Sequence, residues 1–189
     1  YTTLRTFLLG QLPSEWSYSI AGQLSWINLL YEIINEAIVL PLYFFMGQAV
    51  ADKKEYTNRI RSGLLISLGI YTVCSTLVMI FVNPLLRFMA VSSDIISESA
   101  NYIRIECIAN IFGILYSFIC VTLITIGKDK LVYAITAAKL ILSLILDTLL
   151  VSTLPVSLNL GVNGIGISNI ISNLILFIIA VILIYKCGY

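Results

Sequence analysis

The chain is short, strongly apolar and sparsely charged. Its 189 residues are 59% hydrophobic and 11% charged with a net charge of +1, whereas soluble domains are about 45–50% apolar and about 25% charged. This composition excludes a soluble globular protein and gives no charge-based reason to expect nucleic acid as a partner, so we expect the lipid bilayer to surround the protein. The absence of histidine excludes imidazole ligands and His-based catalytic triads.

Six helical elements follow one another along the chain, and five of them are long enough to cross a bilayer, which takes about 20 apolar residues. Residues Tyr1–Leu12 look like the end of a helix whose start is missing, so we interpret the chain as a fragment. The predicted complete spans are Ser17–Gly47, Ser62–Val82, Ser99–Ile126, Leu131–Thr153 and Val162–Tyr185. Asn83-Pro84 predicts the end of the second of these. The expected fold is an all-α polytopic membrane bundle of about six transmembrane helices, forming a single lobe over residues 1–189.

Basic residues are distributed unequally between alternate loops. One set of loops carries Lys53, Lys54, Lys128 and Lys130, whereas the other set carries Arg87. Because basic loops remain on the cytoplasmic side, the pattern predicts a multi-pass protein of the plasma membrane with the lysine-rich loops in the cytoplasm.

Polar side chains interrupt the first complete span in helical register. Asn28, Glu32, Asn35 and Glu36 fall on one face of the predicted helix. Charged groups in a membrane span usually face a cavity or a partner. Because two carboxylates one turn apart repel each other when both are ionised, this pair is suited to hold a proton or share a cation.

Similar stripes occur in later spans. Lys139, Ser143 and Asp147 stand at i, i+4 and i+8, and Asp147 is the clearest single candidate for an ion-coupling carboxylate. Glu106 begins a polar stripe in the third complete span. Because it lies near the predicted end of that span, a structural and a functional role are equally expected for it. Asn169 belongs to a cluster in the last span.

Helix packing is the alternative explanation for these stripes, since Asn and Ser commonly hydrogen-bond across membrane helices. Buried carboxylates are expensive for that purpose, which favours function for Glu32, Glu36 and Asp147. No HExxH, GxSxG or GxGD motif is present, so we do not expect an enzyme, a cofactor or a metal centre.

Several short motifs resemble, in order along the chain, segments of MATE (multidrug and toxic compound extrusion) transporters. They are Gly10-Gln11-Leu12 at the end of helix one, Gly47–Lys53 after helix two, Gly127-Lys128 after helix four and Gly161–Asn169 at the entrance to helix six. Their order and spacing cover the whole chain. The resemblance implies the N-terminal half of a twelve-helix fold, with most of helix one missing.

This resemblance implies a secondary transporter that uses H⁺ or Na⁺ entry to export small organic, often cationic, compounds by alternating access. The C-terminal lobe of the same protein would be a partner. The family's acidic residue in helix five matches Asp147, the Asn one turn earlier matches Ser143, and the helix-six Thr matches Asn169.

One position departs from the family pattern. Counting back from Gly10 places Arg5 where the family carries an Asp that binds the coupling cation. A fixed positive charge there opposes Na⁺ binding, so we expect Arg5 to pair with Glu32, Glu36 or Asp147 and proton coupling to be favoured. Two alternatives stay open: a flippase for lipid-linked sugars with a related fold, and a non-transporting membrane scaffold. Arg5 and Lys139 are the two cations expected inside the bundle.

Overall fold

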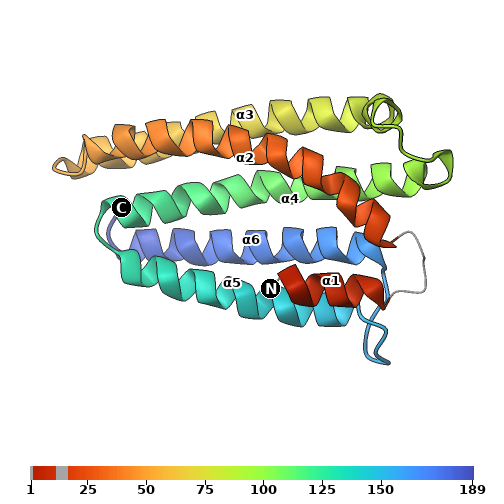
Figure 1. Cartoon of the computed structure of the whole chain (residues 1–189). Helices are drawn as coiled ribbons and strands as arrows, with labels where there is room; N and C mark the ends of the chain where they lie inside the picture. The colour runs from red at the N-terminus through yellow and green to blue at the C-terminus, as the bar shows by residue number, and fades with distance from the viewer. Residues whose placement is uncertain (1, 12–16) are drawn as a thin grey trace.

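The computed structural model describes residues 2–11 and 17–189, within which the chain forms six α-helices and no strand. Consecutive helices run in opposite directions in one bundle, so that α4 runs parallel to α6 and to α2 (Figure 1). Their bounds are α1 Thr2–Gly10, α2 Ser17–Gly47, α3 Lys53–Phe88, α4 Ser93–Thr125, α5 Asp129–Leu150 and α6 Val162–Lys186. The predicted all-helical bundle is therefore confirmed. Of the segment predicted as the end of a helix, Tyr1 and Leu12 lie outside the described residues.

Five of these helices, α2 to α6, are long and apolar enough to cross a membrane. Large apolar side chains cover their outer surfaces, including Leu65, Phe81 and Ile141, each more than half exposed. In a soluble protein such a surface would cause aggregation, whereas in a bilayer it contacts acyl chains. The chain is a multi-pass membrane protein.

The second complete span is longer than predicted at both ends. Asp52 caps the N-terminus of α3, where its side chain accepts hydrogen bonds from the backbone amides of Lys54, at 2.9 Å, and Glu55, at 3.1 Å. The cap starts the helix nine residues before the predicted Ser62. Pro84 lies inside the helix rather than after it, so the prediction that Asn83-Pro84 ends this span is wrong.

The end of α5 is shorter than predicted because the following loop folds back on it. The amides of Leu158 and Leu160 donate to the carbonyls of Leu149, at 2.9 Å, and Leu150, at 2.8 Å. These contacts satisfy carbonyl groups that a helix end would otherwise leave without a partner. The helix therefore ends at Leu150 and not at Thr153.

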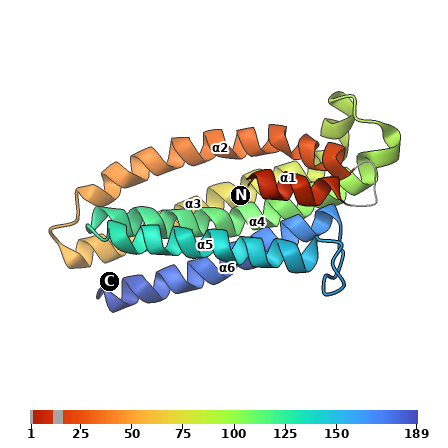
Figure 2. The ribbon, with the colours of Figure 1, turned by 60° about the horizontal axis from the view of Figure 1, so that its bottom comes forward.

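α4 is the central helix of the bundle. It packs against α2, α3 and α6, and lies between them in both views (Figures 1 and 2). About half of its apolar window (56%) is buried within the protein, against 17–28% for the other spans. A polar residue on α4 therefore tends to meet another helix rather than lipid.

Glycine permits the closest approach between α4 and α6. A Cβ added at Gly166 would lie 2.6 Å from the side chain of Ile105, which is closer than non-bonded carbon atoms approach. Since Gly166 lies three residues before Asn169, this contact fixes the distance between the polar groups of α6 and those of α4.

The ends of the bundle alternate as the sequence predicts. The α2–α3 connection, the α4–α5 connection and the C-terminus lie at one end, and the α3–α4 and α5–α6 connections lie at the other (Figure 1). The lysine-rich segments therefore gather at a single end of the molecule.

Candidate functional site

The centre of the candidate site is an ion pair between α1 and α5. Arg5 donates two hydrogen bonds to Asp147, from Nε to Oδ2 at 3.0 Å and from Nη2 to Oδ1 at 3.1 Å. Asp147 is buried, with a side chain 1% exposed, while the Arg5 side chain is 18% exposed. Of the three carboxylates that could pair with Arg5, the structure selects Asp147. Two parallel bonds to one carboxylate give a strong and directional contact.

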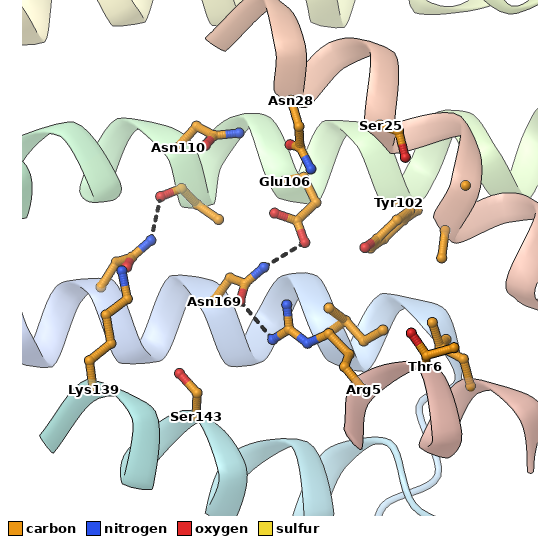
Figure 3. Close-up of a pocket in the computed structure, with 16 residues that line it drawn as sticks. Arg5, Thr6, Ser25, Asn28, Tyr102, Glu106, Asn110, Lys139, Ser143 and Asn169 are labelled. Carbon is orange, nitrogen blue, oxygen red and sulfur yellow. Dashed lines mark hydrogen bonds between the residues drawn. The ribbon is translucent and has the colours of Figure 1, made fainter. Parts of the chain in front are cut away.

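A chain of hydrogen bonds extends this pair to α6 and α4. Nη2 of Arg5 also donates to Oδ1 of Asn169 at 2.9 Å, and Nδ2 of Asn169 donates to Oε1 of Glu106 at 2.7 Å. The chain is visible in Figure 3, where Asn169 lies between Arg5 and Glu106. One amide therefore connects Glu106 on α4 to the Arg5–Asp147 ion pair between α1 and α5.

These residues border a pocket of about 510 Å³ at the junction of α1, α2, α4, α5 and α6. Its charged lining residues are Arg5, Glu106 and Lys139, while Asp147 is buried beneath Arg5. Its uncharged polar lining consists of Thr6, Ser25, Asn28, Tyr102, Asn110, Ser143, Asn169 and Asn173. A pocket with this lining, inside a bundle of apolar helices, can hold a polar or charged ligand.

A second pocket, of about 460 Å³, shares Asn28, Asn110 and Lys139 with the first. Glu32 and Asn35 line it together with three tyrosines, Tyr31, Tyr71 and Tyr116. The predicted stripe on α2 thus faces a cavity at Asn28, Glu32 and Asn35.

Glu36 lies one turn farther along α2; it is exposed, as Glu32 is, but it lines neither of these two pockets. The expectation that Glu32 and Glu36 together form one cation site stays a prediction.

The predicted α5 residues divide between two environments. Ser143 is buried and its hydroxyl lies 3.3 Å from that of Ser172 on α6. The ammonium of Lys139 lies over the Tyr116 ring, 4.8 Å from its centroid. Lys139 and Asp147 therefore contact different partners, as two turns of separation require.

Sequence reasoning underestimated Glu106. The predicted span began at Ser99, which placed Glu106 near a helix end, but α4 begins at Ser93, and Glu106 is 4% exposed at the centre of the bundle. The available signal was its stripe with Asn110. Tyr102, one turn before Glu106, lines the same pocket and directs its hydroxyl to the same side (Figure 3).

Comparison with known proteins gives one match. The family model of MatE matches residues 42–149, which is more than half of the chain and extends from α2 to α5. Searches of the curated proteins and of the solved structures gave no match. The matched segment includes Glu106, Lys139, Ser143 and Asp147 of the site just described.

Proposed function

The chain belongs to the MatE family of membrane transporters, and on that premise we propose that it is the N-terminal lobe of a proton-coupled antiporter that exports small organic compounds. In this proposal the lobe acts with a C-terminal lobe, and the cavity between them opens alternately to the two sides of the plasma membrane. The lysine-rich end faces the cytoplasm.

The observation that carries proton rather than sodium coupling is the position of Arg5. Both carboxylate oxygens of Asp147 and the amide oxygen of Asn169 accept hydrogen bonds from its guanidinium. These are the atoms that the resemblance assigns to cation binding, and a sodium ion would have to displace Arg5 to reach them. A proton needs no such coordination shell.

Glu106 is the group that we propose takes the proton. With both acids ionised, Arg5, Asp147 and Glu106 together carry a charge of −1, and one proton on Glu106 brings the cluster to zero. A buried cluster without net charge is less costly inside a membrane. Asn169 hydrogen-bonds to both Arg5 and Glu106. A change in the charge of Glu106 on α4 therefore alters the hydrogen bonds of Asn169 and, through Arg5, the contact between α1 and α5.

Antiport follows if the substrate and the proton use the same carboxylate. A cationic group of the substrate beside Glu106 excludes the proton, and protonation of Glu106 removes the charge that held the substrate. Each ligand then weakens the binding of the other, and a coupling of this kind is reciprocal.

The test uses the full-length protein in liposomes with an imposed pH gradient and no sodium gradient. We expect accumulation of fluorescent organic compounds, screened across cationic, zwitterionic and anionic members. Glu106→Gln should abolish gradient-driven accumulation and weaken substrate binding, because the neutral amide keeps the shape of the site but carries no charge to hold a cationic group and cannot take up a proton. Glu98→Gln, on an exposed position of the same helix, is the matched control.

Two results would contradict the proposal. Transport that responds to a sodium gradient and not to a pH gradient would exclude proton coupling. Gradient-driven transport that is unchanged in Asp147→Asn would remove the ion pair from the mechanism.

A flippase for lipid-linked sugars is a second candidate, since Arg5 and Lys139 both line the 510 Å³ pocket and could bind a phosphate group. Glu106 in the same lining repels a purely anionic headgroup, which makes this candidate weaker. The scaffold alternative has no observation in its favour, because the family to which the chain belongs consists of transporters.

A further inference from the structure

Lys139 is a cation inside the membrane whose charge the proposed mechanism does not use. It lies near the middle of α5 and is half-buried. Within residues 2–11 and 17–189, the ion pairs are Arg5–Asp147 and Arg59–Glu55, so no acidic group of this part lies within 4.0 Å of its ammonium. The Tyr116 ring, 4.8 Å away, provides a weaker compensation than a carboxylate. Cations in membrane spans usually have an anionic partner.

A second hydrogen-bond donor lies on the same two pockets. The side-chain nitrogen of Asn110 is buried and has no hydrogen-bond partner among the described residues. Asn110 and Lys139 line both pockets and therefore stand at the boundary between them. A buried donor without a partner is costly, and an oxygen of a bound ligand would satisfy it.

The same 510 Å³ pocket presents the opposite charge at Glu106. Asp147 neutralises the charge of Arg5 directly. Glu106 and Lys139 are therefore the two oppositely charged residues that remain in the pocket lining. They come from different helices, and in Figure 3 Lys139 stands apart from the chain of bonds that joins Arg5, Asn169 and Glu106. Lys139 repels a purely cationic ligand, and Glu106 repels a purely anionic one.

Aromatic side chains provide a surface for the body of the ligand. Tyr31 and Tyr71 are stacked with their ring centroids 5.7 Å apart, and both line the second pocket with Tyr116. The hydroxyl of Tyr31 lies 2.8 Å from that of Ser75, and the hydroxyl of Tyr71 donates to the Tyr31 carbonyl. Because their polar ends contact the protein, the rings offer an apolar wall to an aromatic group.

We propose that the compound carried by this transporter is an aromatic zwitterion, with its anionic group held by Lys139 and Asn110 and its cationic group by Glu106. The proposal rests on the export function and specifies its substrate class. Binding would give Lys139 the anionic partner that the described part of the chain lacks. It would also occupy Glu106 with the cationic group of the substrate, so that the substrate and the proton exclude each other at this carboxylate.

The test separates charge from shape by using three ligands with the same indole ring. Tryptophan is the zwitterion, tryptamine the cation and indole-3-propionate the anion. Binding of each radiolabelled compound to the full-length protein is measured by scintillation proximity in the absence of any gradient. We expect tryptophan to bind more tightly than either relative, by about tenfold or more, since each lost charge removes a charge-assisted hydrogen bond.

Lys139→Met should remove this preference. The variant keeps the apolar stem of the side chain, so tryptophan should lose about tenfold in affinity while tryptamine binds equally well or better. Lys130→Met, on the exposed first turn of α5, is the control and should behave as wild type. Asn110→Leu should weaken tryptophan and indole-3-propionate, and not tryptamine.

Three outcomes would overturn the inference. The first is preference for tryptamine in the wild type, and the second is an equal effect of Lys139→Met on all three ligands, which would place its partner in the protein itself. The third is failure of all three to bind, because the set presents the ring and the charges that the site is proposed to recognise. Proton-driven export lost in Glu106→Gln but unaffected by Lys139→Met would retain the export function and reject only the zwitterion.

Discussion

Removal of Arg5 alone should destabilise the protein more than removal of both partners of the Arg5–Asp147 pair. Arg5→Gln leaves Asp147, with its side chain 1% exposed, as a buried carboxylate without its guanidinium. Breaking a buried pair in this way costs about 3–5 kcal/mol. Asp147→Asn leaves Arg5, which is 18% exposed and lines the pocket. Because this side chain can turn toward the pocket, we expect a smaller cost of about 1–3 kcal/mol.

The double variant Arg5→Gln/Asp147→Asn places two neutral amides at these positions. It should cost about 1–2 kcal/mol, since only hydrogen-bond quality is lost. The sum of the single costs would then exceed the cost of the double variant by at least about 2 kcal/mol, which is the coupling between the two side chains.

The thermal midpoint can be measured with a thiol-reactive dye on the full-length protein in detergent after replacement of the half-buried Cys74 and Cys187. Cys107 (0% exposed) and Cys120 (9% exposed) then react only when the bundle opens. At roughly 2–4 °C per kcal/mol for a chain of this size, Arg5→Gln should lower the midpoint by roughly 10 °C. Arg59→Gln, which breaks the pair with exposed Glu55, should change stability by about 1 kcal/mol or less. Additive costs of the two single variants would refute the reasoning.

Two further predictions concern helix packing and access to the pocket. Gly164→Ala should lower the thermal midpoint, because the added Cβ would lie 2.8 Å from the Leu150 carbonyl oxygen and cost about 1–3 kcal/mol of stability. Gly69→Ala is the control and should be neutral or stabilising, because Gly69 has open space around it. Equal midpoints for the two variants would contradict this packing. In a protein without native cysteines, Asn169→Cys should react with a membrane-impermeant thiol reagent because Asn169 lines the pocket. Ser75→Cys, at a fully buried position between helices, should not react, and equal rates at the two positions would show that the pocket is not wet.

The number and character of the helices could be predicted from sequence because they depend on local properties. A run of about 20 apolar residues must form a helix in a bilayer, since its backbone groups have no other partner there. The α2 range, Ser17–Gly47, was predicted without error. The start of α3 was not, because it depends on a capping contact of Asp52 in a charged segment that hydropathy does not mark.

The candidate site was predictable only in part. Arg5 and Asp147 were recognisable as charges in apolar helices, but three carboxylates were possible partners for Arg5. Helical periodicity places residues on a face and does not say which neighbouring helix that face meets. The choice of Asp147 is a consequence of how α1 approaches α5, and at a separation of 142 positions along the chain no local signal predicts it.

The sequence by itself therefore determined a membrane bundle, the alternation of its loops and the presence of charges inside it. These features depend on the length of each apolar run and on the free-energy cost of each charge in the bilayer, and both can be assessed one segment at a time. Only the tertiary structure decided which of those charges cancel and which remain for a ligand. Arg5 is neutralised by Asp147, whereas Glu106 and Lys139 face one pocket without a bond between them. That distinction depends on how α1 meets α5 and on the packing of α4 against α6, which the small residue Gly166 allows. Contacts between distant segments exist only after the helices have assembled.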